Sequence, residues 1–188
     1  MSKLLKILVV LVFILGSAVS FFLYYIGFFG ELTFSEKEMG PYKLVYLDHK
    51  GDYSKSGDIQ MMVYKTLIES YKVKTSRGFG IYFDNPKKVE VEYLRSQVGC
   101  ILEEKDFNQI GAIQKKFKVK DFPKTKSVVT QFPYKNKLSI LAGMFKVYPR
   151  LEEEIKEKGY SPGPVMEIYD MANKKIYYIL PLSQAITP

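Results

Sequence analysis

The sequence predicts an α+β fold in which a strand–helix–strand–strand module is duplicated, preceded by an N-terminal transmembrane helix. Residues 7–30 contain no charge and are long enough to cross a hydrocarbon core of about 30 Å. Beyond them, stretches with two-residue alternation are interspersed with stretches whose apolar residues recur at three and four positions. The order of these stretches in residues 42–104 returns in residues 125–182, which indicates a duplication.

Residues 1–30 are expected to form a single-pass membrane anchor. Tyr24 and Tyr25 lie near the end of the apolar run, where aromatic rings with a polar tip favour the membrane interface. The alternative is a cleaved secretory signal, with small residues at Ala18-Val19-Ser20. The chain stays apolar beyond that point and continues with the bulky Phe21-Phe22, which favours an uncut anchor.

The charges beside the anchor predict its orientation. Lys3 and Lys6 precede it, whereas mainly acidic residues follow it in residues 31–38. Lysines favour the cytoplasmic side of a membrane. The folded domain is therefore expected to be extracytoplasmic.

The first half of the domain follows a short polar linker, residues 31–41. Lys43–His49 alternates as a strand does, and a helix follows whose apolar residues share one face. Gly78–Phe83 and Gln97–Leu102 are two further strands. The predicted helical stripe consists of Ile59, Met62, Val63, Leu67, Ile68 and Tyr71.

The second half repeats this order within a domain that spans residues 42–188, with lobes at about 42–104 and 125–182. Ser127–Phe132 is strand-like, Leu138–Lys158 is helical, and Val165–Tyr169 with Lys175–Leu180 forms a hairpin. A half of this size would bury little core alone, so the two sheets should join. The apolar residues placed on one face of this helix are Leu141, Met144, Phe145, Tyr148, Leu151 and Ile155.

Composition excludes several classes of protein. Cys100 and His49 are each the sole residue of their type, which leaves no disulfide and no cysteine- or histidine-based zinc site, so we expect no metal and no cofactor. The net charge of +8 comes without any recognition-helix or base-stacking motif, so nucleic acid is not an expected partner. The densest basic stretch, residues 115–126, is interpreted as a solvated loop.

Glu167 is the most informative charged position. It lies within the apolar strand Val165–Tyr169, and alternation places it on the same face as Val165 and Tyr169. A buried carboxylate must find a donor, a proton or a cation, and aromatic rings around it would suit an apolar cation. The tyrosines expected beside it are Tyr53, Tyr82, Tyr134, Tyr169 and Tyr178. The alternative is a solvent-facing Glu167 paired with Lys174 or Lys175 across the hairpin.

Four short motifs follow one another along the chain: Lys50-Gly51-Asp52-Tyr53, Gly80-Ile81-Tyr82-Phe83-Asp84-Asn85-Pro86, Leu94-Arg95 with Val98-Gly99, and Met166-Glu167-Ile168-Tyr169. In this order and spacing they resemble the gyrase-inhibitor-like (GyrI-like) small-molecule-binding family, which includes effector domains of multidrug-responsive transcription factors. The resemblance covers Tyr42 to Leu182 and implies a duplicated module with a ligand cleft between lobes. It also implies that the family's acidic cleft residue is Glu167.

The function expected from these observations is a membrane-anchored domain that binds an apolar or cationic small molecule, with the membrane contacted through residues 7–30. Two alternatives stay open. One is a receptor or adaptor with a protein partner. The N-terminal span, together with Tyr82-Phe83-Asp84-Asn85-Pro86, Phe132-Pro133-Tyr134 and Tyr148-Pro149, resembles a membrane-anchored branch of the superfamily that acts in autophagy of the endoplasmic reticulum as a receptor. That branch uses a long acidic tail, whereas this sequence stops at Pro188. The other is a hydrolase of strained electrophilic small molecules, with Glu167 as its base.

Overall fold

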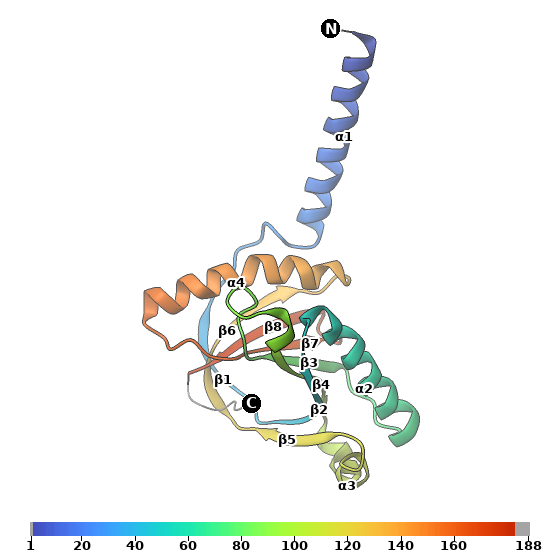
Figure 1. Cartoon of the computed structure of the whole chain (residues 1–188), viewed down its shortest axis with the longest axis vertical. Helices are drawn as coiled ribbons and strands as arrows, with labels where there is room; N and C mark the ends of the chain where they lie inside the picture. The colour runs from blue at the N-terminus through green and yellow to red at the C-terminus, as the bar shows by residue number, and fades with distance from the viewer. Residues whose placement is uncertain (1, 183–188) are drawn as a thin grey trace.

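The computed structural model describes residues 2–182 and consists of a projecting helix and one curled sheet with helices packed on it (Figure 1). Helix α1 (Lys3–Tyr25) has no buried residue along its length. It is long and apolar enough to cross a membrane. Its last residues and the turn that follows them meet the folded domain near α4 (Figure 1).

The sheet has eight strands over the described residues, all paired antiparallel, in the order β1-β6-β8-β7-β3-β4-β2-β5. Two longer helices, α2 (Ser56–Tyr71) and α4 (Leu138–Lys158), and the short α3 (Ile110–Ile113) accompany it. The strands are β1 (Ser35–Met39), β2 (Tyr42–Lys50), β3 (Arg77–Tyr82), β4 (Arg95–Leu102), β5 (Lys118–Phe122), β6 (Thr125–Pro133), β7 (Val165–Asp170) and β8 (Lys175–Pro181).

The predicted duplication is confirmed. The first half runs β2-α2-β3-β4 and the second runs β6-α4-β7-β8. The halves meet at β3 and β7, where Gly80 lies opposite Glu167. This pairing joins both halves into one continuous sheet, as the small size of each half required.

Two segments differ from their prediction, because each contains an edge strand. Residues 31–41 are more than a linker, since β1 within them pairs with β6. Residues 115–126 are more than a solvated loop, since β5 within them pairs with β2. Three of the five residues in each of these strands are charged. Charged side chains are common on edge strands because they stay in water there while the backbone pairs on one side.

The two faces of the sheet have different cores. Helix α2 covers a cluster that includes Val45, Val63 and Cys100, while α4 covers another with Phe132 and Tyr178. The opposite face holds a third cluster to which both halves contribute. Its buried members are Leu44, Tyr46, Phe79, Ile81, Ile101, Phe122, Val129, Met166, Ile168 and Ile179.

The buried face of α4 differs from the predicted stripe. Leu151 is buried as expected, but Leu141, Met144 and Phe145 are exposed. The helix instead approaches the sheet through small residues, which let its backbone lie close to the aromatic rings beneath. The buried residues of α4 are Ser139, Ala142, Gly143, Val147 and Leu151. In α2, Met62 is likewise exposed, while Val63 and Leu67 are buried.

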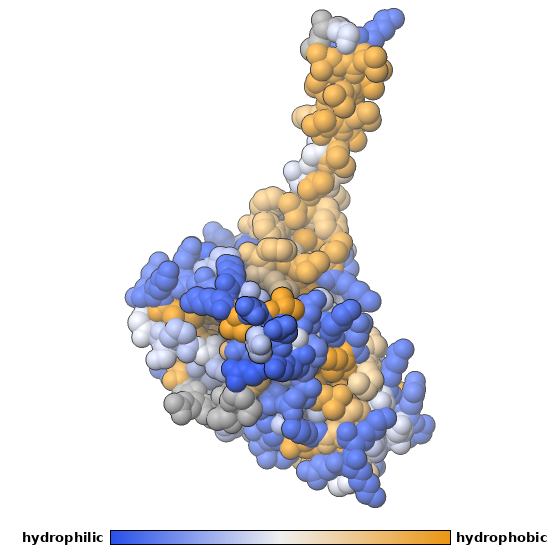
Figure 2. Space-filling view, in the orientation of Figure 1, coloured by the Kyte–Doolittle hydropathy of each residue, from blue (hydrophilic) through white to orange (hydrophobic). Residues whose placement is uncertain are grey.

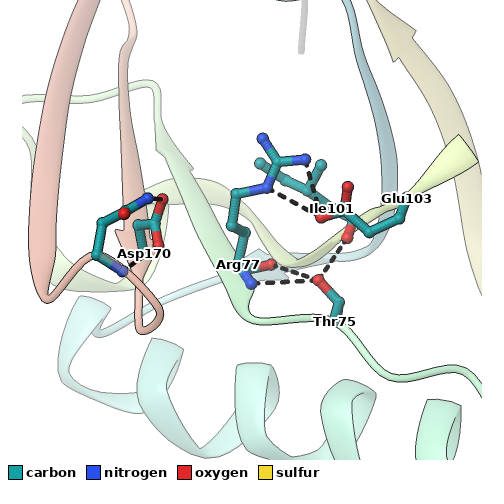
Figure 3. A network of polar contacts seen from close by, with 6 residues as sticks. Thr75, Arg77, Ile101, Glu103 and Asp170 are labelled. Carbon is teal, nitrogen blue, oxygen red and sulfur yellow. Dashed lines mark hydrogen bonds and ion pairs between the residues drawn. The ribbon is translucent and has the colours of Figure 1, made fainter.

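A polar network holds the start of β3 in place (Figure 3). Thr75 donates its hydroxyl to the carbonyl oxygen of Ile101 at 2.7 Å, and the guanidinium of Arg77 donates to one carboxylate oxygen of Glu103 at 2.9 and 3.2 Å. Asp170, opposite Arg77 in the register, accepts from the backbone N–H of Asn173 and closes the β7–β8 turn. These contacts fix the register that sets Gly80 against Glu167.

Candidate functional site

Glu167 lies in the middle of β7, on the face covered by α4, and its side chain is 1% exposed. One carboxylate oxygen accepts a hydrogen bond from the Tyr148 hydroxyl at 2.6 Å, and the other accepts from Tyr169 at 2.7 Å. None of the ion pairs between residues 2 and 182 includes Glu167. The alternative of a solvent-facing Glu167 paired with Lys174 or Lys175 is therefore wrong; Asp170 is the residue opposite Lys175.

The electrostatics of this site follow from burial. Loss of water around the carboxyl group raises the pKa of Glu167, while the hydrogen bonds from Tyr148 and Tyr169 partly oppose this increase. Burial, and then the negative charge of Glu167, raise the pKa of the Tyr148 and Tyr169 phenols well above their ordinary value. Both phenols therefore stay protonated and act as donors to the carboxylate.

Tyr82 and Tyr178 complete the immediate surroundings. The hydroxyls of Tyr82 and Tyr169 lie 3.3 Å apart, and the Tyr178 ring meets the Tyr148 ring edge-on with centroids 5.9 Å apart. Burial and the Glu167 charge raise the pKa of Tyr82 and Tyr178 as well. The buried Tyr178 hydroxyl has no hydrogen-bond partner among the residues that the structure describes.

The two remaining predicted tyrosines lie further from the carboxylate. The Tyr53 ring contacts the Tyr82 ring at a centroid distance of 4.9 Å, and its hydroxyl donates to the backbone carbonyl of Arg95 at 2.8 Å. Tyr53 thus supports the ring next to the site. Tyr134 packs at the margin of the cluster under α4, and its backbone N–H donates to the carbonyl of Lys174.

Tyr148 is the site residue that the sequence-based prediction missed. Its spacing in the sequence predicts only that it lies on the apolar face of the helix, yet Tyr148 makes the shortest hydrogen bond to Glu167. The spacing of Tyr148, Leu151 and Ile155 marks a buried stripe that includes a phenol. A buried phenol needs a polar partner, and this requirement is the signal that could have identified it.

Two glycines make room for the phenols. A Cβ atom on Gly80, directly across from Glu167, would lie 2.7 Å from the Tyr82 oxygen, and one on Gly143 of α4 would overlap the Tyr178 oxygen. Depressions of about 520 and 300 Å³ lie elsewhere, one near Arg77 and the other near Tyr160. The space around Glu167 is filled by aromatic rings in this conformation.

This arrangement combines two features that attract positive charge. The buried carboxyl group of Glu167 lies among phenol rings, whose faces attract positive charge, and it has no cationic partner among the described residues. An organic cation near Glu167 would gain from both the carboxylate and the rings.

The sequence matches known proteins over the region just described. Residues 32–182 match the family described as GyrI-like small molecule binding domain. Testis-expressed protein 264 from Homo sapiens is 33% identical over 148 residues, which cover 75% of this chain and 44% of that protein. Its homologue from Mus musculus is 32% identical, with 75% and 45% covered. The chain thus spans less than half the length of these curated relatives.

Solved structures agree on the fold. The structure of SAV2435 bound to tetraphenylphosphonium has a TM-score of 0.54 at 9% identity, with 81% of this chain and 94% of that chain covered. The C-terminal domain of EcmrR gives a TM-score of 0.54 at 9% identity, with 80% and 96% covered. At such identities the likeness concerns the fold. The match over residues 32–182 shows that this chain belongs to the GyrI-like small molecule binding domain family.

Proposed function

We propose that this chain is a membrane-anchored protein that binds an apolar organic cation beside Glu167, within the tyrosines Tyr82, Tyr148, Tyr169 and Tyr178. The observation that carries the proposal is the environment of the carboxylate. It is buried, two phenols donate to it, and no Lys or Arg of residues 2–182 pairs with it.

The energetics favour a cationic ligand over a neutral one. Two neutral donors compensate only part of the cost of burying a carboxylate, because its pKa stays raised. A cation would offset that cost directly and would also meet the ring faces. Since the rings fill the space, at least one phenol must give up its position when a ligand enters. Tyr53 and Tyr134, further out, would contact the larger part of such a ligand.

The anchor places this activity at a membrane. We propose that α1 remains in the chain as a single span and that the domain is extracytoplasmic, since Lys3 and Lys6 lie at the opposite end of α1. Protease treatment of sealed vesicles whose cytoplasmic face is outward tests this orientation. We expect the domain to be protected until detergent is added. Digestion of the domain in intact vesicles would show that it lies on the cytoplasmic side instead.

Binding is tested with the full chain in lipid nanodiscs and with tetraphenylphosphonium, the cation bound by the structural neighbour SAV2435. We expect saturable binding that Glu167→Gln weakens at least tenfold, which corresponds to about 1.4 kcal/mol. Asp170→Asn is the matched control, because it makes the same change on the same strand at a carboxylate that bonds Asn173 instead of the phenols. Full-strength binding by Glu167→Gln would contradict the proposal.

A further inference from the structure

The first two turns of α4 expose an apolar face. Leu138 and Leu141 are each 51% exposed and Phe145 is 76% exposed. Their spacing of three and four residues puts all three on one side of the helix. We call these three residues the α4 apolar face. An aromatic ring this exposed, together with two exposed leucines on the same side of the helix, indicates an interaction surface.

This face adjoins the foot of the anchor. Ile26, just after α1, is 1% exposed and packs with Phe132 and Ala142 beneath α4. The Lys146 ammonium of α4 donates to the backbone carbonyls of Phe28 and Gly30. Anchor and helix are therefore joined by a packed junction. Figure 1 shows α4 running crosswise to α1 at this junction, and Figure 2 shows the apolar surface of α1 continuing down onto the top of the domain.

The residues around the junction have the composition of a membrane interface. Tyr24, Tyr25 and Phe29 are 73%, 53% and 62% exposed. Lys135 and Lys137, just before α4, are exposed as well, and the Lys135 ammonium lies 5.9 Å from the centre of the Tyr25 ring. Aromatic rings and lysines gather where hydrocarbon meets headgroups, and lysines attract anionic lipid.

The dimensions agree with this placement. The 23 residues of α1 span about 34 Å, slightly more than a hydrocarbon core of about 30 Å. The end of α1, and with it α4, therefore falls at the membrane surface. Beyond Phe145 the outward side chains of α4 become charged, with Arg150, Glu152 and Glu153 exposed. Only the part of the helix next to the anchor is suited to lipid.

We infer that the α4 apolar face docks onto the same bilayer that α1 crosses, with Leu138, Leu141 and Phe145 inserted among the lipids of the adjacent leaflet. This inference rests on the proposed membrane anchoring. Docking holds the domain in one orientation on the membrane. It also brings Tyr148, one turn after Phe145 and bonded to Glu167, close to the lipid surface, where apolar cations accumulate.

The absence of tryptophan from this sequence allows a direct test with single tryptophan probes. Phe145→Trp reports on the α4 apolar face and Phe13→Trp on the span. Phe107→Trp, in the 3₁₀ turn Glu104–Gln109 near α3, reports on the far end of the domain (Figure 1). Each full-length variant is placed in vesicles with and without brominated lipid, which quenches tryptophan within the bilayer. We expect at least twofold quenching at positions 13 and 145 and none at position 107.

The probes separate the two hypotheses. Unquenched Phe13→Trp would refute the anchor itself. Quenching of Phe13→Trp, with Phe145→Trp behaving like Phe107→Trp, would refute docking and leave the anchor in place. A second set uses Leu141→Trp as the probe: Phe145→Asp should at least halve its quenching, whereas Met61→Asp, on an exposed site of α2, should leave it unchanged. Equal quenching of the Leu141→Trp probe alone, with Phe145→Asp and with Met61→Asp would also overturn the inference.

Discussion

At neutral pH, the carboxyl group of Glu167 destabilises the folded state of the unliganded protein relative to the unfolded chain. Burial raises its pKa, so the native state holds this proton more tightly than the unfolded chain does. The stabilisation that results is complete below the ordinary pKa of 4.5 and is lost as the pH rises through the folded-state pKa. A buried carboxyl group whose pKa is raised in the folded state is typical of a functional site.

Glu167→Gln should therefore stabilise the unliganded protein at about pH 7.5 and have little effect at about pH 4, where the wild-type carboxyl is also neutral. We expect its melting temperature at the higher pH to increase by at least about 2 °C, the shift that roughly 1 kcal/mol produces in a domain of this size. Circular dichroism melts at both pH values measure this. A lower melting temperature at about pH 7.5 would contradict a raised pKa.

Tyr148→Phe removes one of the two donors to the buried carboxylate. A hydrogen bond to a charged group contributes about 1.5–3 kcal/mol, so we expect a loss of that size at neutral pH and a smaller one in acid. Tyr160→Phe is the matched control, because its phenol donates to Glu36 at the surface and the change should cost under about 1 kcal/mol. Denaturant unfolding compares the two variants. Equal losses in the free energy of unfolding would show that the hydrogen bond from Tyr148 to Glu167 contributes no more than a surface hydrogen bond.

The helices and strands show how far sequence alone could lead. Alternation, short apolar runs and turn signals located six strands, and the three- and four-residue recurrence of apolar residues located α2 and α4. These patterns failed at β1 and β5, whose charged side chains give no pattern and whose pairing depends on neighbours distant in sequence. They also placed Leu141, Met144 and Phe145 of α4 on the buried face, although these three residues are exposed while Ala142 and Gly143 are buried. Glu167 is identifiable from the sequence as a charge in an apolar strand. The phenol of Tyr148 signals that it needs a polar partner, but only the packed structure shows that this partner is Glu167 on another element.

The contact of α4 with the sheet depends on Gly143. An added methyl group there would overlap the Tyr178 oxygen, so Gly143→Ala should cost about 1–3 kcal/mol despite the better helix propensity of alanine. The same substitution at Gly57 in α2 meets nothing within 4 Å and should stabilise by about 0.4–1 kcal/mol. Urea unfolding of both variants measures these opposite signs. If Gly143→Ala were stabilising, the Tyr178 side chain would have to shift at little cost, and α4 would be packed less tightly on the sheet than the structure indicates.

The whole domain should unfold as one unit, because its two halves share a core. Phe79 of the first half is fully buried among residues that include Met166 and Ile168 of the second, on the face away from the helices. Phe79→Ala should cost about 3–5 kcal/mol and accelerate global amide exchange in β4 of the first half and β8 of the second by the same factor. Phe107→Ala, at a partly exposed ring, is the control and should affect neither strand comparably. Faster exchange in β4 alone would mean that the lobes unfold independently. The site at Glu167 contains Tyr82 from one lobe and Tyr148 from the other, so unfolding of either lobe would then disrupt it.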